Sequence, residues 1–143
     1  CIFELKQAYP KYAPYIVAYW YCYKDMDGGE IPGIYDVMKD LKDRGYHLYC
    51  LTNWSHETFP IVKEVHSHLF ELFDGIVVSG EEKMVKPNPE IYNLLLSRYN
   101  LKASESIFID DRQRNVDGAN QVGIHGILFK GSNELKEQLA QYL

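Results

Sequence analysis

The stretch Ile107-Phe108-Ile109-Asp110-Asp111 places two adjacent carboxylates directly after three apolar residues. A short apolar run with a polar end is typical of a buried strand in a parallel sheet, and ligands of such sheets bind beyond the carboxyl ends of the strands. Two neighbouring carboxylates there repel each other unless a cation or hydrogen bonds compensate, and a helix N-cap would explain only one of them. Because Mg²⁺ prefers hard oxygen ligands, Asp110 and Asp111 are candidate metal ligands.

The same rhythm continues on both sides of this stretch, since short apolar runs alternate with amphipathic helical stretches from Gly33 onward. The alternation predicts βαβ units and therefore an α/β fold with a parallel sheet. We expect strands over residues 46–51, 75–79, 106–109 and 126–129. We expect helices over residues 34–44, 57–69, 89–99 and 115–122, and a terminal helix from residue 133.

Two further polar sites follow apolar strands. Thr52 and Asn53 end the strand 46–51, where a hydroxyl and nearby amides can donate hydrogen bonds to an anionic oxygen, although a helix cap or turn explains them better when they are taken alone. Lys86 is followed by Pro87 and Pro89, which stiffen the backbone around one cation suited to phosphate, although a single loop lysine is usually solvated. The order of hydroxyl, lysine and paired acids, each near a successive strand end, is more specific than any one site.

These stretches resemble three sequence motifs of the haloacid dehalogenase superfamily, numbered II, III and IV. Residues 51–55 resemble motif II, residues 78–89 resemble motif III, and residues 107–111 with Asn115 resemble motif IV. Within the superfamily, the chain is most similar to the branch that carries a helical cap after the first strand. That branch contains sugar-phosphate phosphatases and the phosphatase-like domain of epoxide hydrolases. The resemblance covers about residues 30–143 and implies a three-layer Rossmann-like core.

The resemblance also implies a reaction, in which a nucleophilic Asp is phosphorylated and then hydrolysed. It assigns phosphoryl binding to Thr52 and Asn53 and charge stabilisation to Lys86, so that Thr52 and Lys86 are the catalytic residues. It assigns Mg²⁺ binding to Asp111, assisted by Asp110. We therefore expect a magnesium-dependent hydrolase of a small phosphate ester, with a sugar phosphate as one candidate substrate.

The first motif of the family, D-x-D-G-T after an apolar strand, is not clearly present. Residues 25–29 read Asp-Met-Asp-Gly-Gly, but Lys24 precedes them and the fifth position is Gly29 instead of Thr. We interpret this stretch as a decoy. The central strand and its nucleophile are then expected upstream of Cys1, and the sheet would have unpaired backbone groups at its middle.

The first 30 or so residues are rich in aromatic side chains and lack the βαβ rhythm. We expect residues 1–31 to be helical and to form the C-terminal part of the cap with its linker, and residues 32–143 to form the core. Tyrosines of this region could line a substrate pocket, although packing among helices is their more common role. His56 could touch substrate, although capping or solvent exposure explains it better, and we expect His66 and His68 to be solvated.

Composition excludes several classes of protein. The net charge is −5 and the basic residues are dispersed, which argues against nucleic acid as a partner. No apolar stretch approaches the length of a membrane span, and three cysteines without a C-x-x-C pair favour a reducing compartment, so we expect a cytoplasmic protein.

Two other functions remain: a metal-independent haloacid dehalogenase, which the paired acids argue against, and a non-catalytic binding module or fragment of the same fold.

Overall fold

The computed structural model of the protein describes residues 2–23 and 28–142, and over these ranges it is an α/β fold. The predicted Asp25 and Asp27 decoy lies outside the described residues. The N-terminal part contains α1 (Ile2–Ala8), η1 (Pro10–Tyr12) and α2 (Ala13–Tyr21). The remainder contains α3 (Ile34–Asp43), β1 (Tyr49–Thr52), α4 (Phe59–Val65), α5 (Ser67–Phe70), β2 (Gly75–Val78), α6 (Ser79–Glu82), α7 (Pro89–Arg98), η3 (Ala103–Glu105), β3 (Ile107–Asp110), α8 (Gln113–Gln121), β4 (His125–Leu128) and α9 (Ser132–Leu139).

The strands form two separate pairs. β1 pairs in parallel with β2, from Tyr49 opposite Gly75 to Thr52 opposite Val78. β3 pairs in parallel with β4, from Ile107 opposite His125 to Asp110 opposite Leu128. Within the described residues no ladder joins the two pairs, so β1 and β3 each keep one edge unpaired. The predicted parallel arrangement is confirmed. The unpaired edges of β1 and β3 also agree with the unpaired backbone groups that the sequence led us to expect at the middle of the sheet.

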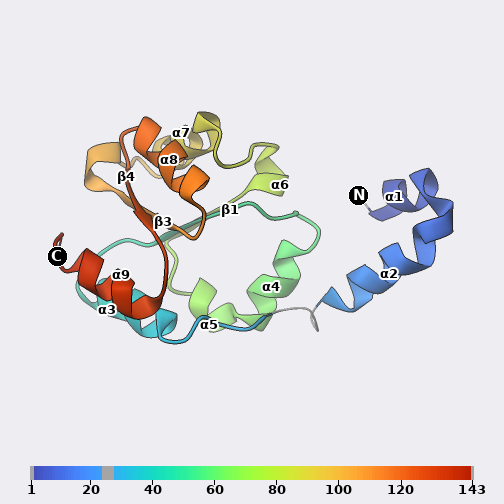
Figure 1. Cartoon of the computed structure of the whole chain (residues 1–143), viewed down its shortest axis with the longest axis horizontal. Helices are drawn as coiled ribbons and strands as arrows, with labels where there is room; N and C mark the ends of the chain where they lie inside the picture. Colours follow the sequence, from blue (N-terminus) through green and yellow to red (C-terminus); the bar gives the residue numbers. More distant parts are fainter. Residues whose placement is uncertain (1, 24–27, 143) are drawn as a thin grey trace.

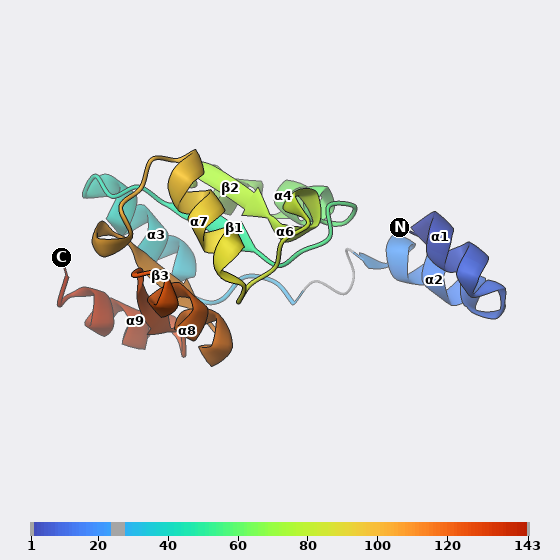
Figure 2. The ribbon, with the colours of Figure 1, turned by 90° about the horizontal axis from the view of Figure 1, so that it is seen from above.

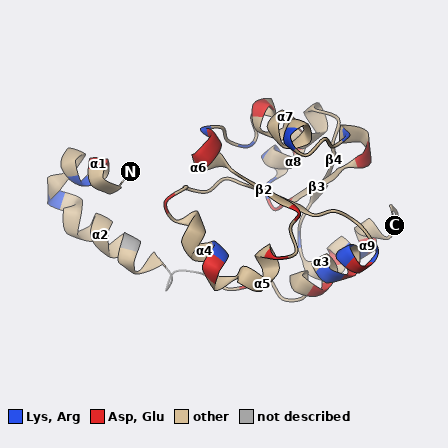
Figure 3. Cartoon of the chain, turned by 180° about the vertical axis from the view of Figure 1, so that it is seen from behind, with Lys and Arg blue, Asp and Glu red and all other residues tan. Residues whose placement is uncertain are grey.

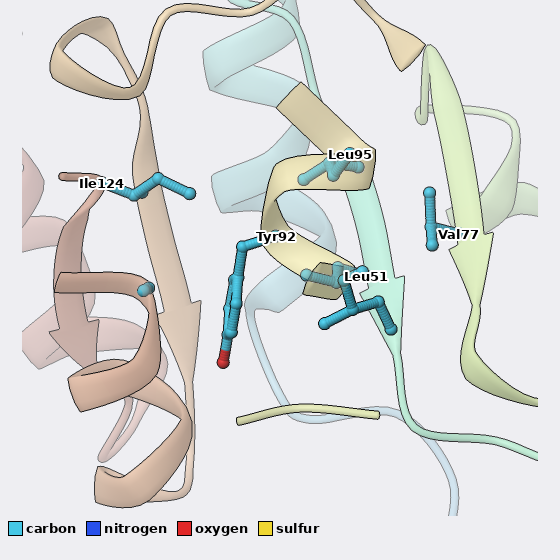
Figure 4. Close-up of a cluster of buried hydrophobic side chains, with 7 residues drawn as sticks. Leu51, Val77, Tyr92, Leu95 and Ile124 are labelled. Carbon is cyan, nitrogen blue, oxygen red and sulfur yellow. The ribbon is translucent and has the colours of Figure 1, made fainter. Parts of the chain in front are cut away.

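Helices cover both faces of the strands, which gives three layers (Figure 1). Helices α6, α7 and α8 lie on one side, and α3, α4, α5 and α9 lie on the other. Two apolar clusters hold the layers together. The first is centred on α7 and includes Leu51, Val77, Tyr92, Leu95 and Ile124 (Figure 4). The second joins α3 to α9 through Val37, Leu41, Ile127, Leu135 and Leu139.

Most predicted elements are confirmed to within two residues at each end, and two differ more. The strand expected from residue 46 begins at Tyr49, because the Leu48 amide donates to the Asp74 carboxylate at 2.8 Å and the Leu48 carbonyl accepts from the Asp74 amide. The helix expected over 57–69 is two short helices, because the backbone of His66 leaves the helical region at φ −107° and ψ 34°. In addition, α6 is a short helix that the sequence pattern did not predict.

The N-terminal helices lie apart from the layered core (Figure 2). Their helical character is confirmed, whereas their assignment to a cap stays a prediction. Helix α1 has no buried residue, and Tyr15 and Tyr21 are 73% and 79% exposed. Tyr23 reaches the core, since its ring meets that of Trp54 edge-on at a centroid distance of 6.3 Å.

The surface carries acidic and basic residues interspersed over the same helices (Figure 3). No helix of the described residues is both long enough and apolar enough to cross a membrane.

Candidate active site

The site is built around Lys86, in the loop between α6 and α7. The Lys86 ammonium donates hydrogen bonds to the Leu51 carbonyl at 2.6 Å and to Asp110 Oδ2 at 2.8 Å. Leu51 belongs to β1 and Asp110 ends β3, so one ammonium joins the carboxyl ends of the two separate sheets. The Lys86 and Asp110 side chains are only 9% and 7% exposed. The alternative of a solvated loop lysine is therefore wrong.

Asp110 accepts hydrogen bonds on both of its carboxylate oxygens. Besides Lys86 on Oδ2, its Oδ1 accepts from the Arg112 amide and from Asn115 Nδ2, both at 2.9 Å. Burial alone would raise the pKa of Asp110, but the Lys86, Arg112 and Asn115 donors outweigh it and hold the pKa below the ordinary value. Asp110 therefore stays a carboxylate, with its negative charge directed at Lys86.

Asp111 has a different environment. Its side chain is exposed at the same edge, and it makes no hydrogen bond or ion pair with any residue that the structure describes. The buried Oδ1 of Asn115, on α8, has no hydrogen-bond partner in the described parts of the chain, although the same amide donates to Asp110. A carboxylate ready to accept a ligand and a buried acceptor without a donor are what a hydrated hard cation would satisfy. The residues present therefore fit Mg²⁺.

The two acids are not a complete metal site. No group of three or more His, Cys, Asp or Glu side chains suited to a metal occurs over residues 2–23 and 28–142. Mg²⁺ commonly binds one or two protein carboxylates and completes its shell with water and substrate oxygens. The assignment of Asp110 and Asp111 to the metal stays a prediction that this geometry fits.

Thr52 and Asn53 follow Leu51 at the end of β1. The Thr52 side chain is half-buried, and its hydroxyl has no hydrogen-bond partner among the residues described, so it is free to donate to a ligand. Among the described residues no hydrogen bond joins Thr52 to Lys86, and the phosphoryl-binding role of Thr52 stays a prediction. Asn53 is already engaged: its Oδ1 accepts from the Lys86 amide at 2.8 Å, and its Nδ2 donates to the Lys86 carbonyl at 2.9 Å.

Helix α8 packs closely against the Lys86 loop. A Cβ at Gly118 would lie 2.6 Å from the Pro87 carbonyl oxygen and 3.0 Å from the Tyr92 hydroxyl, so only glycine allows this approach. The buried Tyr92 hydroxyl donates to the Asn115 carbonyl at 2.8 Å. Sequence reasoning missed Gly118 and Tyr92 because their roles depend on contacts between segments about 25–30 residues apart, which no local pattern reports.

The histidines His56, His66 and His68 lie in different environments. His56 is exposed in the loop after β1, and its part in substrate contact stays a prediction. The expectation that His66 and His68 are solvated is wrong for His66, whose side chain is 13% exposed. The break between α4 and α5 lets both rings approach Glu30, His68 Nε2 at 2.7 Å and His66 Nδ1 at 3.4 Å from Oε1.

A cavity of about 480 Å³ lies between the N-terminal helices and the loop after β1. The helices contribute mainly apolar and aromatic side chains, and the loop contributes polar ones. The lining residues are Ile2, Leu5, Tyr15, Ile16, Tyr19, Ser55, Glu57 and Thr58. The loop wall begins three residues after Thr52, so the cavity lies on the chain segment that also forms the site.

Comparison with known proteins places this geometry in a family context. Residues 13–123 match the family of haloacid dehalogenase-like hydrolases. A sesquiterpene phosphatase of Aspergillus oryzae is 37% identical over 91 residues, which cover 64% of this chain and 46% of that protein. A ribulose-1,5-bisphosphate 5-phosphatase of Halopiger xanaduensis is 29% identical over 118 residues, which cover 82% of this chain and 48% of that protein.

A solved structure shares the fold. It is a variant of a haloacid dehalogenase family enzyme from Bacteroides thetaiotaomicron, in complex with magnesium and inorganic phosphate. It is 27% identical with a TM-score of 0.61, covering 67% of this chain and 51% of that one. The present chain spans about half the length of the two phosphatases that it matches.

Proposed function

Because this chain belongs to the haloacid dehalogenase-like hydrolase family, we propose that it is the core of a magnesium-dependent phosphatase for a small phosphoric monoester. The observation that carries the proposal is the buried Lys86–Asp110 pair beside the exposed Asp111, all at the carboxyl ends of the strands. The Lys86 ammonium, which Asp110 holds at this edge, can contact phosphoryl oxygens. The similarity to phosphatases of two different organisms supports the same reaction class.

Each residue has a stated task in this proposal. Lys86 neutralises negative charge on the phosphoryl oxygens, and Asp110 keeps the ammonium in place. Thr52 donates its hydroxyl hydrogen to a phosphoryl oxygen. Asp111 and Asp110 would hold Mg²⁺, which, when bound, supplies further positive charge that offsets the charge of the phosphoryl group.

The nucleophile is proposed to be a carboxylate on a strand that lies between β1 and β3. This position would pair the open edges of both strands and would bring the carboxylate beside Lys86. One carboxylate oxygen attacks phosphorus while the ester P–O bond breaks, and the leaving alkoxide takes a proton from solvent water to form the alcohol. Water then attacks phosphorus, the bond to the carboxylate breaks, and inorganic phosphate is released.

The organic part of the ester is proposed to bind in the cavity between α1, α2 and the loop after β1. Its apolar and aromatic lining suits the carbon skeleton, while Ser55 and Thr58 offer hydroxyls. The relatives act on esters as different as a sesquiterpene phosphate and a sugar bisphosphate, so the substrate is proposed only as a small phosphate ester.

Cys22 and Cys50 are free thiols, which supports a reducing compartment such as the cytoplasm.

The test uses the full-length protein and a generic aryl phosphate. We expect hydrolysis that requires added Mg²⁺ and stops with a chelator. We expect Asp111→Asn to lower turnover by about a hundredfold or more, because one charged ligand near the transition state is lost. The matched control is Asp117→Asn on α8, where an exposed carboxylate bonds, among the residues that the structure describes, only to Gln113 and should be dispensable.

Other outcomes would support the alternatives. Hydrolysis of a haloacid without metal would favour a dehalogenase and overturn the phosphatase proposal. Retention of phosphatase activity after Asp111→Asn or after chelation would show that these acids do not serve a metal. No hydrolysis of any phosphate ester by the folded full-length protein would favour a binding module.

A further inference from the structure

The Asn53 side chain contacts the main chain of Lys86 at two points. Its Oδ1 accepts from the Lys86 amide at 2.8 Å, and its Nδ2 donates to the Lys86 carbonyl at 2.9 Å. The planar amide thus binds both polar backbone groups of one residue, as a neighbouring strand would. Two such bonds fix the position and the direction of the Lys86 backbone, and no other described side chain bonds to it.

Apart from the packing of Pro87 against Gly118 of α8, the described residues offer the Lys86 main chain little other support. It lies between α6 and α7, outside any helix or strand, and its own hydrogen bond joins the Asn88 amide to the Val85 carbonyl. The ammonium nevertheless meets acceptors on two different sheets, at 2.6 Å and 2.8 Å. A lysine has four rotatable side-chain bonds, and holding it in one geometry costs rotamer entropy. Anchoring its main chain limits how far the ammonium can stray.

The chemistry of the side chain explains why asparagine suits this place. An amide carries an acceptor and a donor side by side in one plane. Aspartate would offer acceptors only and would face the Lys86 carbonyl with a negative charge, while alanine would offer neither group. Asn53 is also the residue after Thr52, so the same strand end supplies a candidate phosphoryl contact and the anchor for the lysine.

We propose that Asn53 is a positioning residue, which holds the main chain of Lys86 so that its ammonium reaches the reacting phosphoryl group. The inference rests on the proposed phosphatase function and deepens it. It differs from the sequence-based assignment of the Asn53 side chain to phosphoryl binding. An anchor for Lys86 acts on the rate of the chemical step, whereas a direct phosphate contact acts on ground-state binding as well.

The kinetic test compares Asn53→Ala with Asn93→Ala in the full-length protein on an aryl phosphate. Asn93 is an exposed asparagine on α7 and serves as the matched control. We expect Asn53→Ala to lower kcat by about tenfold to a hundredfold with KM changed less than about threefold, since the charge remains but is less well placed. We expect Lys86→Ala to cost more. The proposal would be overturned if Asn53→Ala mainly raised KM, or raised the inhibition constant of inorganic phosphate.

A second measurement does not depend on activity. The Lys86 ammonium, held by two hydrogen bonds and largely buried, should give a resolved proton–nitrogen NMR signal that Lys86→Arg removes. In Asn53→Ala this signal should broaden or vanish while the backbone amide spectrum stays native. If the signal and the spectrum both stay unchanged, Asn53 does not position Lys86. If the signal vanishes but neither variant nor parent hydrolyses phosphate esters, the positioning holds and the proposed function fails.

Discussion

The layered core and the N-terminal helices differ in how their aromatic and polar groups are used. In the core, Tyr92 is fully buried and its hydroxyl is bonded, and the charged Lys86 and Asp110 are paired below the surface. In the helices α1 and α2, Tyr15 and Tyr19 are 73% and 57% exposed. Side chains of the core stabilise the fold and form the site, whereas the two helices expose apolar side chains beside the cavity. The two regions should therefore respond very differently to the same substitution.

The largest difference is expected for tyrosine truncation. Tyr92→Ala removes a ring that packs edge-on against Phe108 at 5.4 Å, and should lower the free energy of unfolding by about 3–5 kcal/mol. Tyr15→Ala, on exposed α2, should change it by less than about 0.5 kcal/mol. Urea unfolding followed by circular dichroism would measure both. Equal effects would show that α2 is buried against other parts of the protein and would remove the contrast.

Cysteine reactivity compares the same two regions. Burial raises the pKa of the Cys50 thiol to about 11, although Lys86 opposes the shift, while Cys22 is exposed near the end of α2. Near neutral pH, Cys50 should therefore hold about a hundredfold less thiolate than an ordinary cysteine. Alkylation mapped by mass spectrometry should modify Cys22 first and Cys50 far more slowly, and urea should remove the difference. Equal rates in the native protein would contradict the burial of β1.

The smallest effect concerns Asp74, which binds the start of β1 to α3. Its carboxylate accepts from Lys42 Nζ at 2.7 Å and from the Leu48 amide at 2.8 Å. Asp74→Asn should cost about 1 kcal/mol of unfolding free energy at neutral pH, since a charged hydrogen-bond acceptor is lost. Asp117→Asn, an exposed change on α8, is the control.

The same substitution has a pH signature. Partial burial raises the pKa of Asp74, but the Lys42 and Leu48 hydrogen bonds outweigh it and hold the pKa below its usual range. A lowered pKa in the folded state means that the stabilisation is complete above the pKa of the unfolded chain, and is lost as the pH falls through the lower folded value. The stability gap between the parent and Asp74→Asn should therefore narrow from neutral pH to about pH 3. A constant gap would mean that the charge of Asp74 is not involved.

By itself, the sequence determined the α/β class, the parallel pairing, the strand ends that carry Thr52 and Asp110, and the loop that carries Lys86. These features follow from local patterns, because apolar runs and polar stops reflect which faces of an element are buried. It also predicted the unpaired middle of the sheet, since the order of motifs implied a strand that residues 32–143 do not supply.

Only the tertiary structure decided which contacts Thr52, Asn53, Lys86 and the two aspartates make. Asn53 and Lys86 are 33 positions apart, yet one amide bonds to both backbone groups of the lysine. The Asp110 side chain is buried and accepts hydrogen bonds, while the side chain of the adjacent Asp111 is exposed. Because both residues are aspartates, the sequence alone does not predict this difference. The physical reason is that the environment of each side chain depends on packing between distant segments, as at Gly118 and Pro87, and no local periodicity encodes it.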